Sequence, residues 1–438
     1  MKKKLILGII CLVVLVASGF ATYKVLDSKN KKPDDKQTEQ PAENPPQEYK
    51  DTDYNVKLIK TVNSTVNGNY LISPYSIEIA LQMLRDGAKG ESKTQIDNLI
   101  GNRDIPTFSA KGRISVANAA FIKDSYKDYV EKSYYDKLAT YDAEIIYDPF
   151  VSPSKINEWV NEKTYEMIPK ILDDMSKDFV LGIANAVAID VEWYNSFECN
   201  KTRSGEFTKT DGSKMNTEMM HELYSGGLTK YFETDDAKGI ILPYTPYKSD
   251  GETDYEGQAS STKLEFVGIL PNGSVDEYIE GLTKEKLASF DSNAITASRK
   301  VNISLYLPRF AYEFDLKEFK SVLIAMGVKD VFNPDNADLT GMISRENIKK
   351  MDADNIYVAT AIHKTYIDLN EKGTKAAAVT YFGVDKAAAA LEDDLEIKEI
   401  TFNKPFVYMI RDSKTKEILF FGVVETPNEW KGSTCSEK

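Results

Sequence analysis

The feature that most constrains this chain is an uninterrupted stretch from about Asp53 to Pro427. It contains no linker, no internal repeat and no low-complexity block. Residues 77–84 have helical spacing after a Ser-Pro-x-Ser start, and apolar residues alternate over 301–307 until Pro308 ends the run. The sequence therefore predicts one large α+β domain over residues 53–427, built around a large sheet.

Three further sequence patterns predict other elements of this domain. Apolar residues at helical spacing predict an amphipathic helix from Ile156 to Ile171. Residues 402–410 and 417–424 read as two closing strands joined by a turn. The polar run 248–262 predicts a loop between strands.

Composition excludes several classes of function. The formal net charge of −13 argues against nucleic acid as a partner, because binding phosphates requires clustered Lys and Arg. Cys11, Cys199 and Cys435 are too few for a disulfide framework or a cysteine-rich zinc site. With only His221 and His363, a site with several His ligands is nearly excluded, and we expect no metal and no cofactor. His221 receives no role.

The N-terminus is typical of an export signal. Three lysines at 2–4 precede the uncharged stretch from Leu5 to Tyr23. Gly19 and Ala21 offer a cleavage site, yet the stretch is also long enough to span a bilayer as a helix. Residues 1–27 are therefore either a signal peptide or a membrane anchor. Both interpretations predict an extracellular protein, secreted or held at the cell surface, with no other contact to a membrane.

Two polar segments flank the domain. Residues 28–52 carry four prolines among charged and amide side chains, so they predict a disordered linker. Residues 428–438 predict a polar tail, in which Cys435 is expected to be an exposed thiol without a structural partner.

The segment 370–399 is unusual because it is long and lacks the periodicity of a core element. Residues 374, 376, 378 and 380 are all small and uncharged, so as a strand one face could slide between other strands while Lys375 stays in water. An alanine-rich run taken alone favours a helix instead.

The chain resembles the serpin family, and the resemblance runs along nearly the whole domain. It rests on the order and spacing of many short motifs rather than on any one of them. These are Ser73-Pro74-Tyr75-Ser76 leading to Gly87-Ala88-Lys89-Gly90-Glu91, Val116-Ala117-Asn118-Ala119, Ile156-Asn157-x-Trp159-Val160 with Thr164, Asn185-Ala186 with Trp193 and Phe197, Leu307-Pro308-Arg309-Phe310, Met326-Gly327-Val328 with Phe332, Glu371-Lys372-Gly373-Thr374-x-Ala376-Ala377-Ala378, Phe402-Asn403-Lys404-Pro405-Phe406 and Phe421-Gly422.

The resemblance implies a fold of three β-sheets, eight or nine helices and an exposed reactive-centre loop. It also implies a monomeric inhibitor of serine proteases that is not itself an enzyme. The lysine-rich export signal, without a disulfide framework, suggests a bacterial surface. The partner would be a serine protease, held in a covalent acyl complex while the cleaved loop inserts into the main sheet; strand insertion of this kind is a known example of stored strain.

The resemblance also assigns residues to roles. The loop hinge would comprise Glu371, Gly373, Thr374, Ala376, Ala377 and Ala378. A polar cluster under the centre of the main sheet, called the shutter, would comprise Ser73, Ser76, Asn185 and His363. Trp193 would lie at the breach, where the loop first enters the sheet; an ordinary core tryptophan and, for His363, an ordinary core histidine are the alternatives.

Family spacing, counted as seventeen residues starting with Glu371 itself, ends on Ala387 and places the reactive bond at Ala387–Ala388. A small residue there suits elastase-like or subtilisin-like proteases. Lys386–Ala387 would suit a trypsin-like enzyme instead, and the later alanines of the run to Ala390 remain open. The extra acidic residues after this run depart from the family pattern.

Two other classes of function remain as alternatives. A non-inhibitory serpin, acting as a surface binding or structural protein, is left open by the lengthened loop. A hydrolase has little support, because no nucleophile elbow or Ser-His-Asp set appears in the sequence. The small-residue hinge favours the inhibitor.

Overall fold

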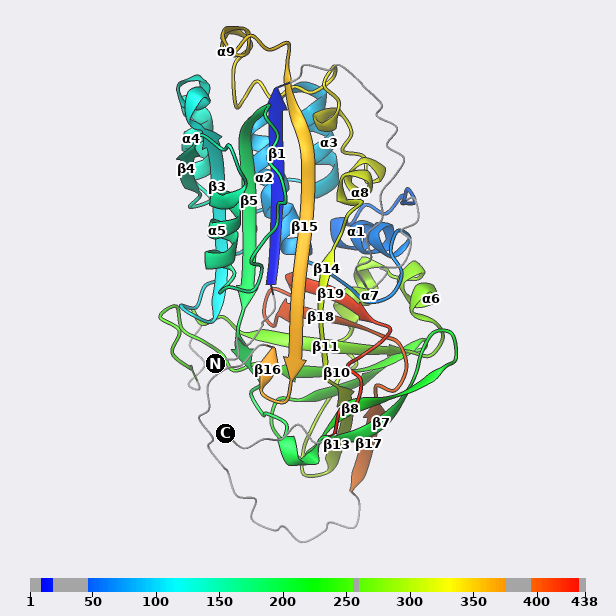
Figure 1. Cartoon of the computed structure of the whole chain (residues 1–438). Coiled ribbons are helices and arrows are strands. Elements are labelled where there is room, and N and C mark those ends of the chain that lie inside the picture. The colour runs from blue at the N-terminus through cyan, green and yellow to red at the C-terminus, as the bar shows by residue number, and fades with distance from the viewer. Residues whose placement is uncertain (1–8, 19–45, 255–259, 375–394, 433–438) are drawn as a thin grey trace, which may run out of the picture.

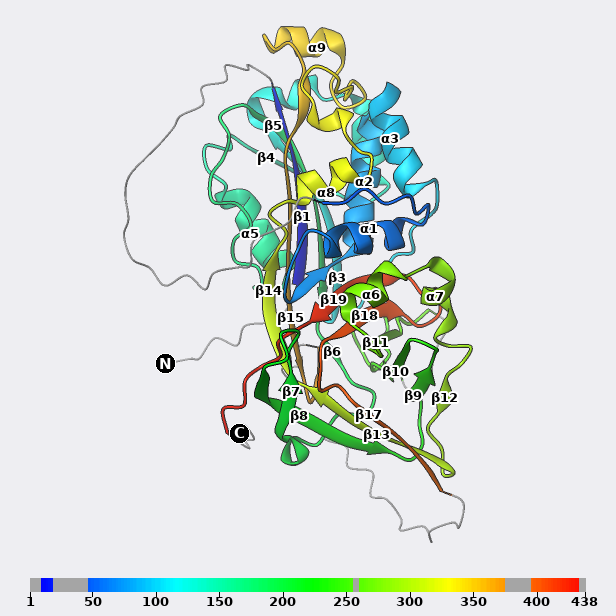
Figure 2. The same ribbon diagram turned by 90° about the vertical axis from the view of Figure 1, so that its right-hand side faces the viewer.

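The computed structural model describes residues 9–18, 46–254, 260–374 and 395–432. These residues form three β-sheets, nine α-helices and three short 3-10 helices. The predicted α+β fold with three sheets and eight or nine helices is therefore confirmed. Figures 1 and 2 show an elongated molecule whose main sheet runs along its length.

The main sheet, here sheet A, has eight strands among the described residues. Its path is β4-β3-β5-β1-β15-β16-β6, and β14 pairs with β15. The strands are β4 Glu144–Asp148, β3 Ile114–Lys123, β5 Phe179–Ile189, β1 Ile9–Ser18, β15 Ile356–Asn370, β16 Gly373–Thr374, β6 Val191–Glu192 and β14 Phe310–Asp315.

Two further sheets complete the other end of the molecule (Figure 1). Sheet B comprises β12 Ile295–Thr296, β9 Lys230–Glu233, β10 Ala237–Pro243, β11 Leu264–Pro271, β18 Phe406–Asp412, β19 Ile418–Val424 and β2 Tyr70–Ile72, in that order. Sheet C comprises β17 Glu396–Thr401, β13 Val301–Pro308, β8 Lys214–Tyr224 and β7 Arg203–Thr208.

Helices cover both faces of sheet A (Figure 2). The nine helices of the described residues are α1 Tyr54–Asn63, α2 Pro74–Gly87, α3 Gly90–Ile100, α4 Lys132–Ala139, α5 Ser154–Lys163, α6 Val275–Glu280, α7 Lys284–Ser289, α8 Phe319–Ala325 and α9 Arg345–Lys350, of which α6 and α7 lie beside sheet B. The 3-10 helices are Asp124–Tyr129, Cys199–Lys201 and Asp330–Phe332.

Helix α2 forms as the sequence predicts, because Ser73 caps it and Pro74 occupies its first turn. Its side chains join the larger of two apolar cores, which lies between sheets A and B and their helices. Helix α5 packs on the opposite face of sheet A through a smaller core, where Trp159 meets Phe121 edge to face.

Two predicted elements have other boundaries. Helix α5 ends at Lys163, so the prediction of a helix up to Ile171 was wrong in its second half. Tyr165 and Glu166 have φ values of 48° and 62°, which a right-handed helix cannot contain. Strand β18 begins only at Phe406, after Pro405, which has no N–H to donate to a ladder.

The N-terminal apolar segment lies in sheet A. The sequence suggested a helix able to span a bilayer, whereas Ile9–Ser18 form strand β1, drawn in dark blue between β5 and β15 in Figure 1. Half of its ten residues are β-branched, which favours an extended strand when partner strands are present. Within the described part of the chain, no helix is both long enough and apolar enough to cross a membrane. A role of this segment in export stays a prediction.

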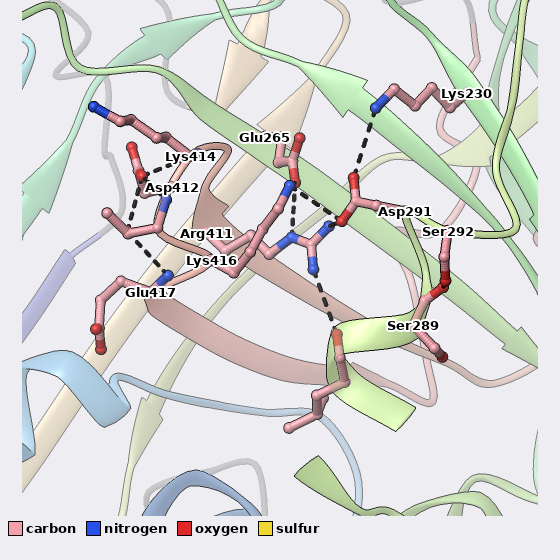
Figure 3. Close-up of polar contacts among 12 residues, drawn as sticks. Lys230, Glu265, Ser289, Asp291, Ser292, Arg411, Asp412, Lys414, Lys416 and Glu417 are labelled. Atoms are coloured by element: carbon pink, nitrogen blue, oxygen red, sulfur yellow. Dashed lines mark hydrogen bonds and ion pairs between the residues drawn. The ribbon is translucent and has the colours of Figure 1, made fainter. Parts of the chain in front are cut away.

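A buried ion cluster fixes helix α7 against sheet B (Figure 3). Arg411 is almost wholly buried; its Nε donates to Glu265 at 2.7 Å and its Nη2 to Asp291 at 2.6 Å. Lys416 contacts both carboxylates at 3.1 Å. Burial opposes ionisation of Asp291, but Arg411, Lys416 and Lys230 together hold the pKa of this carboxyl below its usual value. Each charge of the cluster is partnered, so we regard it as structural.

Candidate functional site

The hinge enters sheet A as a short strand beside the C-terminal end of β15, at the lower end of the sheet in Figure 1. Gly373 and Thr374 form β16, which pairs with Asn370 and Leu369 of β15 on one side and with β6 on the other. A Cβ atom at Gly373 would lie 2.1 Å from the carbonyl oxygen of Val191. Only glycine therefore fits where the chain turns back against β6. Thr374 is buried, and its hydroxyl lies 2.5 Å from the hydroxyl of Tyr244.

Glu371 anchors the base of the loop by a buried ion pair. Its side chain is 4% exposed and receives hydrogen bonds from Arg309 Nε at 2.7 Å and from Thr202 Oγ1 at 2.5 Å. Arg309 also approaches Glu371 through Nη2 and lies 3.5 Å from Glu218 through Nη1. This contact through two guanidinium nitrogens holds Glu371, two residues before the hinge glycine, in one place.

Trp193 packs against the same hinge. Its Nε1 donates to the carbonyl of Asn370 at 2.9 Å, and its backbone N–H donates to that of Lys372 at 2.8 Å. Its ring stacks on Tyr244 with centroids 4.5 Å apart. The structure thus places Trp193 where the loop enters the sheet, which is the place implied by the resemblance; its functional role stays a prediction.

The predicted shutter residues come together below the centre of sheet A. All four are fully buried. The backbone N–H of Ser73 donates to His363 Nε2 at 3.2 Å, and the hydroxyl of Ser76 bonds Asn185 Oδ1. Asn185 Nδ2 in turn donates to Asn118 Oδ1 at 2.8 Å. These bonds link α2 to β5, β3 and β15.

His363 is a neutral imidazole whose ring N–H has no acceptor among the described residues. Because Nε2 accepts a hydrogen bond, the ring proton lies on Nδ1, which has no hydrogen-bond partner among the described residues. Burial lowers the pKa of His363 to about 3, since no carboxylate stabilises the imidazolium. An unpaired buried donor is costly, so this site favours any rearrangement that supplies an acceptor.

Sequence reasoning missed several residues of this site. Arg309, Thr202 and Tyr244 contact the hinge, and Asn118 extends the shutter. Arg309 and Asn118 occur within the motifs that carry the resemblance, which was the available signal; Thr202 and Tyr244 had none. The remaining hinge residues Ala376, Ala377 and Ala378, and the reactive-bond candidates Lys386, Ala387 and Ala388, lie outside the described residues.

Two residues without a predicted role have definite surroundings. His221 stacks on Tyr306, with ring centroids 4.3 Å apart, and lines a groove of about 600 Å³ on sheet C. Lys201 in this groove is already paired with Glu198 and Glu222. Cys199, beside Glu198, is disulfide-bonded, which the sequence analysis did not predict. Cys435 lies outside the described residues. In the described part of the chain no three His, Cys, Asp or Glu side chains are grouped to hold a metal.

Comparisons with known proteins place the chain in a family. Residues 50–427 match the family model "Serpin (serine protease inhibitor)". An uncharacterized serpin-like protein of Methanosarcina acetivorans is 30% identical over 83% of each chain. A leukocyte elastase inhibitor of Xenopus tropicalis is 27% identical, over 86% of this chain and 98% of the relative. The chain therefore belongs to the serpin family.

A solved structure agrees with this assignment. The native state of tengpin, a thermophilic serpin, superimposes with a TM-score of 0.68 at 30% identity, covering 86% of this chain and 92% of tengpin. The matched region covers nearly the whole length of these relatives, so residues 50–427 correspond to a complete serpin domain.

We expect Glu371→Gln to loosen the hinge. The substitution removes one of the two carboxylates that contact the partly buried Arg309, the other being Glu218, which costs about 2–3 kcal/mol after allowance for its partial exposure. The thermal midpoint of the full chain should fall by about 4 °C or more, measured by circular dichroism.

Glu346→Gln is the matched control, because Glu346 and Lys350 form an exposed pair within one helix and contribute little. Equal midpoints for the Glu371→Gln and Glu346→Gln variants would show that Glu371 does not anchor the hinge.

We expect His363 to make stability depend on pH. Its pKa is about 3 in the folded chain and about 6.5 when unfolded, so the unfolded state binds the extra proton between these values. The stabilisation is complete above about pH 6.5 and falls by about 1.4 kcal/mol per pH unit as the pH drops below it. Thermal midpoints at pH 7, 6 and 5 should fall more steeply for the wild type than for His363→Asn.

His221→Asn is the control for this experiment, because it removes the other histidine and should keep the steep slope. The same slope in the wild type and in His363→Asn would contradict the assignment of a neutral, buried His363.

Proposed function

We propose that this protein inhibits serine endopeptidases as a suicide substrate, with the cleaved loop inserting between β5 and β15. The protease serine would attack the carbonyl of the scissile residue, the peptide bond would break, and the new amino terminus would leave with the chain from Ala388 onward. The scissile residue would stay attached to the protease as an ester. Insertion must then outrun hydrolysis of that ester.

One observation carries this proposal: the hinge is already aligned with the position that the loop would fill. Thr374 pairs with Leu369 of β15 and Val191 of β6. Six residues further on, the same register places Thr380 opposite residue 369 − 6 = 363 and residue 191 − 6 = 185, which are His363 and Asn185. The inserting loop would therefore pass directly over the shutter.

The register also assigns the faces of the inserted loop. Directly opposed residues of antiparallel strands point to the same side, and Leu369 and His363 are both buried. Thr374, Ala376, Ala378 and Thr380 would then face the core, and Lys375 would face solvent. In that state the hydroxyl of Thr380 could supply an acceptor for His363 Nδ1–H, which has none among the residues that the structure describes.

The small side chain at Ala387 supports an elastase-like or subtilisin-like target, with Lys386 the alternative site for a trypsin-like one. We further propose that the protein acts outside the cell. The disulfide at Cys199 supports this location, because disulfides persist in oxidising compartments.

The test uses residues 46–438, mixed separately with an elastase, a subtilisin and a trypsin. We expect a band at the summed mass that survives boiling in detergent, and a released peptide whose mass identifies the scissile residue. Cleavage within the loop without such a band, for all three proteases, would contradict the inhibitory function.

Thr374→Arg should convert the inhibitor into a substrate. Burying an unpaired guanidinium beside Tyr244 costs several kcal/mol, and each 1.4 kcal/mol or so slows insertion about tenfold. The stoichiometry of inhibition should rise at least ~10-fold. Lys372→Arg, at an exposed position of the same hinge, should leave it unchanged. Unimpaired trapping by Thr374→Arg would rule out insertion through this register.

A further inference from the structure

Strand β1 lies in the position that the reactive loop would need. It runs antiparallel to both β5 and β15, with nine register pairs to each (Figure 1). Strand β16 runs in the same direction along the same line, just before the N-terminal end of β1. The two segments are 355 residues apart in sequence, from Ser18 to Gly373 (373 − 18), yet they extend one shared strand position.

The register shows how few loop residues could enter sheet A while β1 stays in place. Thr374 pairs with Val191 and Ile9 pairs with Ala188, a difference of three positions. Ile9 therefore occupies the place of loop residue 374 + 3 = 377. Beyond Thr374, only Lys375 and Ala376 have room, and the places from Ala377 onward are filled. Insertion past the shutter requires β1 to leave.

The sequence of β1 makes it a strong competitor for this position. It reads IICLVVLVAS, without charge, glycine or proline. The loop residues that would follow Ala377 include Gly383, Asp385 and Lys386. Glycine and charged residues are poor strand formers, whereas Ile and Val are among the best. Strand propensity therefore favours β1 over the loop residues in this position.

The chain between β1 and the folded domain allows this contact within one molecule. Residues 19–45 number 45 − 19 + 1 = 27, and such a chain can span up to roughly 90 Å. A tethered segment also acts at a high effective concentration compared with one from a second copy. The occupant assigned here is therefore the N-terminal segment of the same chain.

We propose that Ile9–Ser18 is an intramolecular plug that blocks loop insertion, so that the chain retaining it is cleaved as a substrate and does not trap proteases. Removal of the segment from the sheet, by cleavage before Pro46 or by its transfer into a membrane, would yield the inhibitor. This inference rests on the proposed function only in assuming that trapping requires loop insertion. The occupancy of the sheet by β1 is independent of that function.

The test compares three full-length chains: the wild type, Val14→Asp and Val25→Asp. Val14 lies in register with Ala361 and Ile183, both buried, so an aspartate there should expel the plug. Val25→Asp is the same substitution seven residues after Ser18, outside β1, and serves as the matched control.

The first measurement is hydrogen exchange by mass spectrometry on the peptide covering 9–18. We expect protection in the wild type and in Val25→Asp, and its loss in Val14→Asp. The second is covalent trapping, expected for Val14→Asp and absent for the other two. A sizing column should show each chain as a monomer.

Three results would overturn the proposal. One is unprotected exchange of peptide 9–18 in the wild type. Another is equal trapping by the wild type and Val14→Asp while the peptide is protected. The third is a dimer whose protection is lost on dilution, which would assign the contact to a second copy. If residues 46–438 also fail to trap any protease, the inhibitory function has failed, and exchange alone decides whether the plug exists.

Discussion

The structure depends on the strand position between β5 and β15. These two strands are parallel to each other, since both are antiparallel to β1, and each presents a row of backbone N–H and C=O groups toward the other. Such groups are costly when buried and unpaired. An extended segment that fills the position satisfies both rows at once. The surrounding fold determines which segment that can be.

The elements around this position are arranged to admit the loop from one end. Glu371 and Arg309 fix the base of the loop, Gly373 makes the close approach to Val191, and Thr374 begins the strand. Six residues further into the sheet, short polar side chains of the shutter connect β5 and β15 to α2. Hydrogen bonds between hydroxyl, amide and imidazole groups can exchange partners as strands separate, which close apolar packing does less easily. Among the described residues, Nδ1 of His363 has no hydrogen-bond partner, so within them the cluster is not fully satisfied.

Much of the fold could be predicted because its signals are local or carried by motifs. Helix α2 follows from Ser73 and Pro74, and β13 ends at Pro308 as its alternation indicated. The grouping of the shutter residues was predicted only from the family resemblance, since residues 76 and 185 are distant in sequence. Local signals misled where tertiary contacts decide: the periodicity beyond Lys163 is that of buried side chains on an irregular segment. The strand formed by the N-terminal segment could not be predicted from local sequence, because a run of Ile, Val and Leu suits a membrane and a central strand equally well.

The most direct test of the central claim, that strand insertion drives inhibition, is the thermal midpoint of residues 46–438 before and after cleavage of the loop. About ten new backbone hydrogen bonds at about 1 kcal/mol each, at about 2 °C per kcal/mol, predict a rise of roughly 20 °C. An unchanged midpoint after complete cleavage would show that the loop does not insert and would contradict the account.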